Sequence, residues 1–559
     1  MGNRHPDPTP AAEPVTPAPP SGIAPGPGRA SGAAATGTAA EPPPEGDGGL
    51  RAGAIGPGGA LGVTLSNMAP VNGAFLTAPA VVAAMGTQAP WAFLLATLGL
   101  LAGAVTVAEF ARRIVSPGSF VAYTYHAFGT VSPGLGVRLS SGVFYCTLFS
   151  GPLTIGAVAV FAGHWMTASL GLGGAWWLVL SLAVLVFSAA VVLRGIVASS
   201  LVSSVLAAVQ IAVLLGFAAL LLVRSGSAAT VPLHADGGDP GGLAGLSGLT
   251  FPLAVAGMVG WDNSASMAAE LRSPRRVVPV TVLVSVLVVG VTYTLSTWAG
   301  LAGYAGWKGA GPGADRFGDP GNEAPFLELA GHYLPQAHAV LAAVGAISSV
   351  ACLVAALTAM SRISFTAARA GMLPGALGRA SRRRGVPVGA TLLWVGMIGA
   401  CIAVPPLVTD APPATVSSWE AGMGTVPLLI SVLVTLVGLP LYLWRTDRRG
   451  LRPVRHLCVP LVGVAVIGWG VYGNVRPDQP PPGDTYWVCT ALVLVLAALG
   501  AWAFARRPGR DLSALGLGEA PASDGSRADA DASAPAAPSP SRATDPAGTA
   551  AGPRPPHIP

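Results

Sequence analysis

Lysine and cysteine are scarce in this sequence, and each scarcity excludes a class of protein. Lys308 is the only lysine among 559 residues. It lies between Trp307 and Gly309 and not in the GK[ST] pattern that binds nucleotide phosphates, so the chain is not a P-loop ATPase. The five cysteines form no CxxC pair and are predicted to pack as small apolar residues. No HExxH sequence is present, and neither a metal centre nor a cofactor is expected.

Charge is also scarce, which excludes an ordinary soluble domain. Charged residues make up 10% of the chain and apolar residues 52%, whereas soluble domains carry roughly 25% charged residues. This composition predicts a polytopic membrane protein. The chain does not start with a charged segment and a short apolar core, so a secretory signal peptide is not expected. We find no nucleophile and base pair at a common depth, so an enzyme is not expected either.

The two ends of the sequence differ from its middle. Residues 1–55 and 508–559 are rich in Pro, Ala, Gly, Ser and acids, and they lack the apolar residues needed to offset the entropy of an ordered chain. Both ends are therefore predicted to be disordered tails. Residues 56–507 form the predicted transmembrane domain.

Twelve apolar runs between the tails are close to the ~20 residues that a helix needs to cross a bilayer. The predicted fold class is therefore an all-α integral membrane protein. The predicted spans are residues 60–86, 91–114, 133–166, 174–193, 197–223, 248–269, 277–303, 335–361, 387–409, 422–444, 456–474 and 486–505.

Positive charge tests this count, because cytoplasmic loops collect Lys and Arg. With the amino terminus inside, 22 of the 31 lysines and arginines fall on the cytoplasmic side, 4 on the opposite side and the rest in the tails. The asymmetry favours twelve spans with both termini cytoplasmic. We expect a multi-pass protein of the cell membrane that contacts the lipid bilayer and binds no nucleic acid.

The first and sixth predicted spans contain residues that interrupt a helix. Pro70 to Gly73 lie within the first span, and Gly257 and Gly260 lie within the sixth, with Asp262 directly after them. An unwound segment at membrane depth persists only where protein buries it or where it lines a wet cavity. Paired interruptions at corresponding positions of two halves point to a transporter's binding site. The sixth span comes five places after the first, an odd number, so the two run in opposite directions, as an inverted repeat requires.

The ends of the interrupted helices predict a chemistry. A half-helix that begins in the membrane offers N–H groups to an anion, and one that ends there offers carbonyls to a cation. Together they suit a zwitterion, and an amino acid is the natural candidate. The alternative is that these residues only kink packed helices. The candidate substrate-binding residues are Pro70, Val71, Asn72, Gly73, Ala74, Ala256, Gly257, Met258 and Gly260.

Three motifs resemble those of one permease superfamily. They are SPGSFVAYTYHAFG at Ser116 to Gly129, GWDNSASMAAELRSPRRVVP at Gly260 to Pro279, and SRISFTAARAGMLP at Ser361 to Pro374. In this order and spacing they are similar to the amino acid, polyamine and organocation permease superfamily, over about Leu61 to Trp444. The resemblance implies a five-plus-five inverted repeat with broken helices 1 and 6 and two added helices. It also implies alternating access and transport of amino acids or related organic cations.

The chain departs from this family at the first interruption. Where the family often has Gly-Ser-Gly-Ile-Phe, this sequence has Val71 to Phe75, which includes only one glycine. Asn72 adds a side-chain donor at this place. The identity of the substrate is left open by this difference.

Several polar residues within the spans are candidates for gating or for coupling to a proton or a sodium ion. Asp262 matches an acid of the family and is expected either to gate, bind a proton or contact an ammonium group, or to be a buried structural acid. Gln210 matches the lysine that proton-coupled relatives carry in span 5. Glu270 is a candidate gate or structural ion pair. Ser348 and Ser349 match hydroxyl ligands of sodium-coupled relatives, although such hydroxyls usually bond backbone.

These observations predict a secondary permease for an amino acid or a related amine, with the substrate held at the unwound segments of helices 1 and 6. The alternative is a non-transporting solute sensor or scaffold on the same fold.

Overall fold

The part of the chain that the structure describes consists mainly of helices joined by turns and loops. The computed structural model describes residues 50–233, 250–308, 313–319, 322, 324–476, 483–507 and 515, all within the unit Gly46–Pro559. In these ranges the one β pairing is an isolated bridge between Ile55 and Leu271. The predicted all-α class is confirmed. Most of both predicted tails, residues 1–49 and all of 508–559 except Leu515, lies outside the described residues.

Long helices match most of the predicted spans. In the described ranges, ten helical runs are long and apolar enough to cross a membrane. One of them, Pro57–Arg113, contains the first two predicted spans and turns at Gly86, where φ is +60°. The unbroken long helices are α4 (Ala89–Arg113), α6 (Pro133–Ser169), α7 (Trp176–Leu193), α8 (Ile196–Arg224), α11 (Pro274–Gly306), α14 (His338–Arg369), α15 (Val388–Ala403), α17 (Pro413–Thr446), α18 (Val459–Val475) and α19 (Tyr486–Ala505).

The first and sixth predicted spans are built from short pieces instead. The first consists of α1 (Pro57–Asn67), α2 (Pro70–Asn72), a π-helical turn (Gly73–Thr77) and α3 (Ala78–Met85). The sixth consists of α9 (Thr250–Ala256) and α10 (Asn263–Ser266). Short helices outside the spans are α5 (Phe120–Gly129), α12 (Gly313–Phe317) and α13 (Pro325–Tyr333), whereas α16 (Pro405–Val408) lies at the end of the ninth predicted span. The count of twelve crossings and the five-plus-five repeat remain predictions.

One helix is longer than its apolar run. α17 begins at Pro413, well before the predicted start at residue 422. The first turns of this helix contain Ser417 and Glu420, which lowered the local hydropathy, but both side chains are buried by neighbouring helices.

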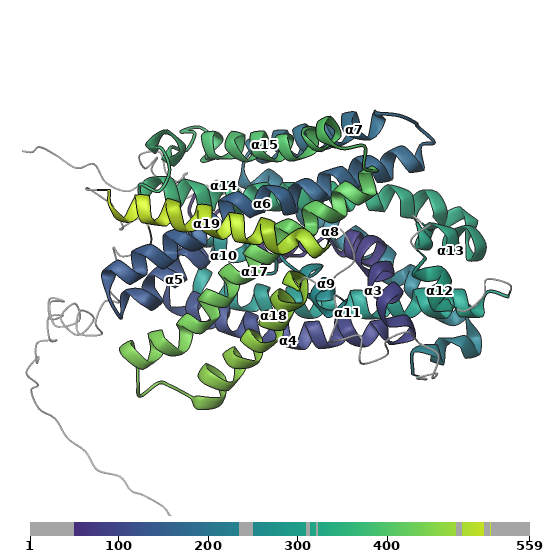
Figure 1. Cartoon of the computed structure of the whole chain (residues 1–559), viewed down its shortest axis with the longest axis horizontal. Helices are drawn as coiled ribbons and strands as arrows, with labels where there is room; N and C mark the ends of the chain where they lie inside the picture. Colours follow the sequence, from purple (N-terminus) through teal and green to yellow (C-terminus); the bar gives the residue numbers. More distant parts are fainter. Residues whose placement is uncertain are drawn as a thin grey trace, which may run out of the picture. The chain divides into compact units, whose positions relative to one another are not determined.

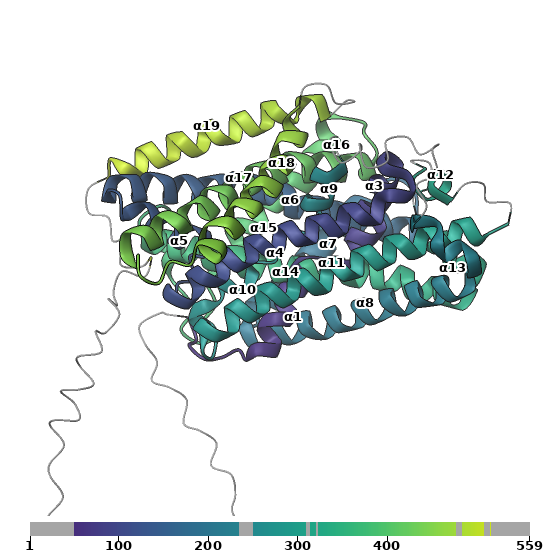
Figure 2. The same ribbon diagram turned by 90° about the horizontal axis from the view of Figure 1, so that it is seen from below.

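Small residues allow the helices to pack closely. α4 lies beside α11, and α6 lies beside α17 (Figures 1 and 2). A Cβ at Gly424 of α17 would approach the backbone N of Thr154 at 2.6 Å, and a Cβ at Gly290 of α11 would overlap Thr97 of α4. Helices in lipid gain little from the hydrophobic effect, so close van der Waals contact at small residues supplies much of their association.

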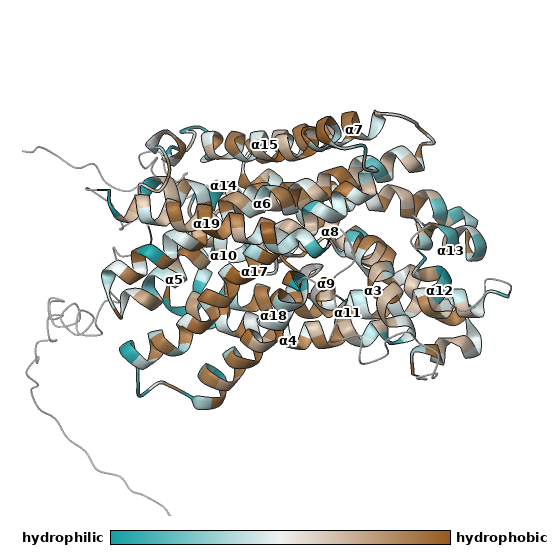
Figure 3. Ribbon diagram, viewed as in Figure 1, coloured by the Kyte–Doolittle hydropathy of each residue, from teal (hydrophilic) through white to brown (hydrophobic). Residues whose placement is uncertain are grey.

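The outer helices expose apolar side chains. Leu201 of α8 is 64% exposed and Leu492 of α19 is 58% exposed. Figure 3 shows hydrophobic residues along the long helices and hydrophilic residues mostly near their ends. Exposed apolar surface on this scale is unfavourable in water and suits contact with lipid tails.

A polar cluster joins α11, α12 and α13 at one end of the helices. The Glu328 carboxylate pairs with Arg316 and accepts hydrogen bonds from the Tyr304 hydroxyl at 2.5 Å and the Asn322 amide at 2.7 Å. The neighbouring Phe326 stacks on Phe75 of the first crossing, with ring centroids 5.3 Å apart. The cluster therefore fixes α13 against the interrupted first crossing.

The Glu328 cluster predicts a dependence of stability on pH. Partial burial raises the pKa of Glu328, but the hydrogen bonds and charge of Arg316, with the bonds from Tyr304 and Asn322, outweigh burial and hold the pKa below its ordinary value of 4.5. A lowered folded-state pKa stabilises the protein above the unfolded value, and this stabilisation is lost as the pH falls through the folded value. We expect Glu328→Gln to lower the melting temperature at neutral pH, with the difference from wild type shrinking below pH 4.5.

The exposed acid Asp410 offers a matched control, and Asp410→Asn should leave the pH profile unchanged. If Glu328→Gln lowers the melting temperature equally at neutral and at acidic pH, the pH dependence does not come from Glu328.

Candidate functional site

The first crossing is interrupted at Ala69. α1 ends at Asn67, and Ala69 adopts a left-handed conformation with φ 45° and ψ 64°. The residue before a proline is disfavoured in the α region, so Pro70 moves the break onto Ala69 while its own φ suits the first turn of the next helix. The first crossing is interrupted as predicted, but the break lies at Met68 and Ala69 and not at the predicted Pro70 to Gly73, which are helical because Pro70 begins the next helix.

The second interruption lies between α9 and α10. The chain leaves the helix after Ala256 and turns through residues 257–262 before α10 begins at Asn263. Gly260 has φ +105°, and a Cβ there would lie 2.5 Å from the Asn67 side-chain nitrogen. Only glycine therefore suits this position. The Asn67 amide donates to the Gly260 carbonyl at 3.3 Å, so the two interruptions are in contact.

A tyrosine hydroxyl of α11 joins the carbonyls of both interruptions. The Tyr293 hydroxyl lies 2.9 Å from the Met68 carbonyl, 3.3 Å from that of Ala69 and 3.1 Å from that of Gly257. A hydroxyl has one proton, so it donates to one of the three at a time. Tyr293 is fully buried. A Cβ at Gly73 would overlap its ring and hydroxyl, so glycine at 73 is what lets the tyrosine reach both breaks.

The two interrupted crossings also meet at the arginine-rich end of the helices. The Ile55 N–H donates to the Glu270 carbonyl at 3.0 Å, and the Arg272 N–H donates to the Ile55 carbonyl at 2.9 Å. Ile55 precedes the first crossing, whereas Glu270 and Arg272 follow the sixth. The start of one crossing and the end of the other therefore lie together, which means that the two run in opposite directions.

Glu270 forms a buried ion pair beneath this bridge. Its carboxylate lies 2.5 Å from the Arg362 guanidinium of α14, and both side chains are almost fully buried. Arg362 also donates to the Thr358 carbonyl at 2.8 Å. Removing one partner from such a pair leaves an uncompensated buried charge, which is strongly destabilising. The predicted structural ion pair is therefore present, and it joins Glu270 to α14 and not to the arginines that directly follow it in the sequence.

One cavity of about 560 Å³ lies between the interruptions and the surrounding helices. Asn72 and Gly73 of the first crossing and Gly257 and Gly260 of the sixth contribute to its wall. Asp262 lines it as well, and its carboxylate accepts a hydrogen bond from the Ser119 hydroxyl at 3.5 Å. Cavities of this size hold small solutes, because ligand pockets span roughly 300–1,000 Å³.

The remaining predicted substrate residues lie behind this wall. Pro70, Val71, Ala74 and Met258 are buried in packed surroundings and do not line the cavity. Ala256 ends α9 directly before the cavity residue Gly257. The predicted set thus divides into residues that face the cavity and residues that support them.

The predicted coupling residues of α8 and α14 form a separate polar cluster with Asn72. The Ser348 hydroxyl donates to the side-chain oxygen Oε1 of Gln210 at 2.6 Å, and the Asn72 side-chain amide donates to the Ser349 hydroxyl at 3.0 Å. All four side chains are buried. The side-chain nitrogen of Gln210 has no hydrogen-bond partner among the described residues. Residues far apart in the sequence therefore meet directly beside the first interruption.

Sequence reasoning missed the two side chains that hold the interruptions together. Tyr293 interrupts the apolar sequence of the seventh predicted span, and Asn67 is a polar residue shortly before the first break. Polar side chains within spans are rare enough to have been a signal. Their partners, however, are carbonyl groups, which no sequence pattern identifies.

Tyr293→Phe tests whether the hydroxyl stabilises the two interruptions. The substitution removes the donor that three buried carbonyls share, and a buried polar group left without a partner costs about 1–3 kcal/mol. We expect the purified protein to melt at a lower temperature. Tyr472→Phe, at a half-exposed ring of α18, should have little effect. Equal melting temperatures for Tyr293→Phe and wild type would show that the carbonyls do not depend on this hydroxyl.

Comparison with known proteins identifies a family for this arrangement. The family model described as amino acid permease matches residues 57–502, which include both interrupted crossings and every residue that lines the cavity. No curated protein matched the chain. Because the matched range covers most of the sequence, the chain belongs to the amino acid permease family and is a multi-pass membrane transporter of amino acids.

Proposed function

We propose that this protein is a secondary transporter that moves an amino acid across the cell membrane by alternating access, with the solute bound between the interruptions of the first and sixth crossings. One observation carries the proposal: a single cavity is lined by Asn72 and Gly73 of the first crossing and by Gly257 and Gly260 of the sixth. Both interruptions therefore present backbone groups to the same solute.

The two interruptions suit the two charged groups of an amino acid. The helical segment that begins at Pro70 leaves its first N–H groups, those of Val71 and Asn72, without an acceptor in the preceding turn of that helix, and a carboxylate is favoured there. The Asn72 side chain lies at the same place and lines the cavity. α9 ends at Ala256, so its last carbonyls are available to an ammonium group. The carbonyl of Gly257, which lies 3.1 Å from the Tyr293 hydroxyl, extends this acceptor surface.

Asp262 is the proposed gate or ammonium contact. It lines the cavity and is joined through Ser119 to the segment directly before α5. Glu270 is proposed to act indirectly, because its ion pair with Arg362 and the bridge at Ile55 hold the two crossings together at the arginine-rich end. By the positive-inside rule this end is proposed to be cytoplasmic, with both termini on that side.

A proton or a sodium ion is the proposed driving ion. Ser348 and Ser349 are the candidate hydroxyl ligands for sodium, and they lie beside Asn72 and Gln210. Gln210 carries no titrating group, so proton coupling would require another residue, for which Asp262 is the candidate in the cavity. Uptake that requires a sodium gradient would identify sodium as the driving ion, and uptake that requires a pH gradient would identify the proton.

Uptake into proteoliposomes tests the proposal. The full chain should accumulate at least one labelled amino acid. Gly73→Ala should abolish uptake, because the added Cβ would overlap Tyr293 between the interruptions. Gly396→Ala is a matched control, since a Cβ at Gly396 meets open space on α15, and it should transport like wild type.

A protein that binds amino acids but never accumulates them would instead be a solute sensor on the same scaffold. Full activity of a stably folded Gly73→Ala variant would contradict the proposed position of the solute.

A further inference from the structure

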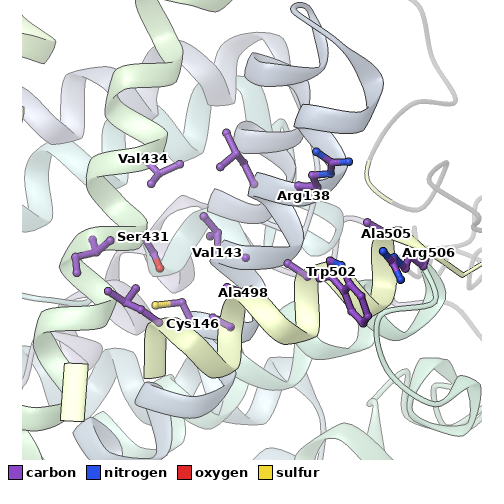
Figure 4. Close-up of a pocket in the computed structure, with 15 residues that line it drawn as sticks. Arg138, Val143, Cys146, Ser431, Val434, Ala498, Trp502, Ala505 and Arg506 are labelled. Atoms are coloured by element: carbon purple, nitrogen blue, oxygen red, sulfur yellow. The ribbon is translucent and has the colours of Figure 1, made fainter. Parts of the chain in front are cut away.

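A second cavity, of about 570 Å³, forms a crevice between α6, α17 and α19. Figure 4 shows Arg138 and Arg506 toward one end of it and Cys146 and Ser431 toward the other. The permease mechanism proposed above does not use this cavity. Ser431 lines both cavities, so α17 separates this crevice from the central site.

The crevice combines two positive charges with an apolar lining. Arg138 lies in the second turn of α6, and Arg506 directly follows α19, so both guanidinium groups lie at the same end of these two antiparallel helices. Neither forms an ion pair with an acidic residue in the part of the chain that the structure describes. Most of the other lining residues are Leu, Val, Ile and Ala. The two arginine charges favour an anionic group in the ligand, whereas the apolar lining favours a hydrocarbon chain.

The aromatic residue beside the arginines marks the depth of the membrane surface. The Trp502 ring is 55% exposed and lies 3.9 Å beneath the Arg506 guanidinium. Tryptophan is enriched where the hydrocarbon meets the headgroups. The two arginines therefore lie at headgroup level, and the rest of the crevice extends into the hydrocarbon.

The length of the crevice matches one leaflet. On α19 the lining runs from Leu494 to Arg506, which is about 18 Å at a rise of about 1.5 Å per residue. Half of the roughly 30 Å hydrocarbon core is about 15 Å. A free phosphate ion would occupy only the arginine end. An acyl chain attached to a phosphate would fill the whole crevice.

We propose that this crevice binds one anionic phospholipid, with its headgroup phosphate between Arg138 and Arg506 and an acyl chain along Val143 and Ala498 toward Cys146 and Ser431. The arginines belong to the charge-rich side predicted to face the cytoplasm, and anionic lipids are abundant in that leaflet. The bound chain contacts α17 at Ile430, Ser431 and Val434, and Ser431 also lines the central cavity. Lipid binding is thereby connected to a helix that also lines the solute site.

Native mass spectrometry of the purified full chain tests the proposal by titration with phosphatidylglycerol and with phosphatidylcholine of the same acyl chains. Wild type should retain one phosphatidylglycerol in preference to phosphatidylcholine. Arg138→Gln with Arg506→Gln should weaken phosphatidylglycerol binding about 30-fold, from the contribution of roughly 1 kcal/mol per arginine near an anionic surface. Arg382→Gln, an exposed arginine outside the crevice, should bind as wild type does.

A second variant tests the apolar part of the crevice. Ala498→Phe fills its middle without changing a charge, so it should reduce the binding of both lipids while the lipid-free protein melts as wild type does. Glycerol phosphate, which carries the phosphate without acyl chains, should not compete. The proposal is overturned if both lipids bind equally well to wild type, if the double arginine variant keeps wild-type affinity, or if glycerol phosphate displaces the lipid.

Discussion

Peptide groups released from a helix inside a membrane must find partners in the protein or in a cavity, because lipid offers none. Two crossings of this chain release such groups, and the structure brings them together. The Tyr293 hydroxyl lies within hydrogen-bond distance of carbonyls of both interruptions and donates to one of them at a time, and the Asn67 amide of the first crossing donates to the Gly260 carbonyl of the second interruption. Residues of both interruptions line one cavity. The arrangement of the surrounding helices follows from this requirement, since α11 and α14 supply the side chains that the unwound segments need.

Small residues make these contacts possible. Gly73 leaves room for the Tyr293 ring, and Gly260 adopts a positive φ against Asn67. Larger side chains would separate the two interruptions and leave their carbonyls without donors. At the arginine-rich end, the backbone bridge at Ile55 and the Glu270–Arg362 pair hold the same two crossings together. A rearrangement that opens this end must separate them, which agrees with the proposed alternating access.

The sequence predicted the interruptions because proline and glycine act locally on the backbone. Pro70, Gly257 and Gly260 each break the helical hydrogen-bond pattern at or next to their own position. The partners of the unwound segments could not be predicted, because Tyr293 and Met68 are 225 residues apart in the chain and meet only through tertiary packing. For the same reason the sequence did not reveal the partner of Glu270, which is Arg362 on α14 and not one of the adjacent arginines. Ser417 and Glu420 shortened the predicted tenth span, since hydropathy does not reveal which polar side chains are buried.

The central claim is that the two interruptions bind the two charged groups of one solute. Calorimetric titration tests it most directly, with a transported amino acid, its methyl ester and its N-acetyl derivative, each of which lacks one of the charges. The account predicts that the amino acid binds and that both derivatives bind far more weakly, because each leaves one interruption without its ionic partner. Equal affinity for the amino acid and either derivative would contradict it.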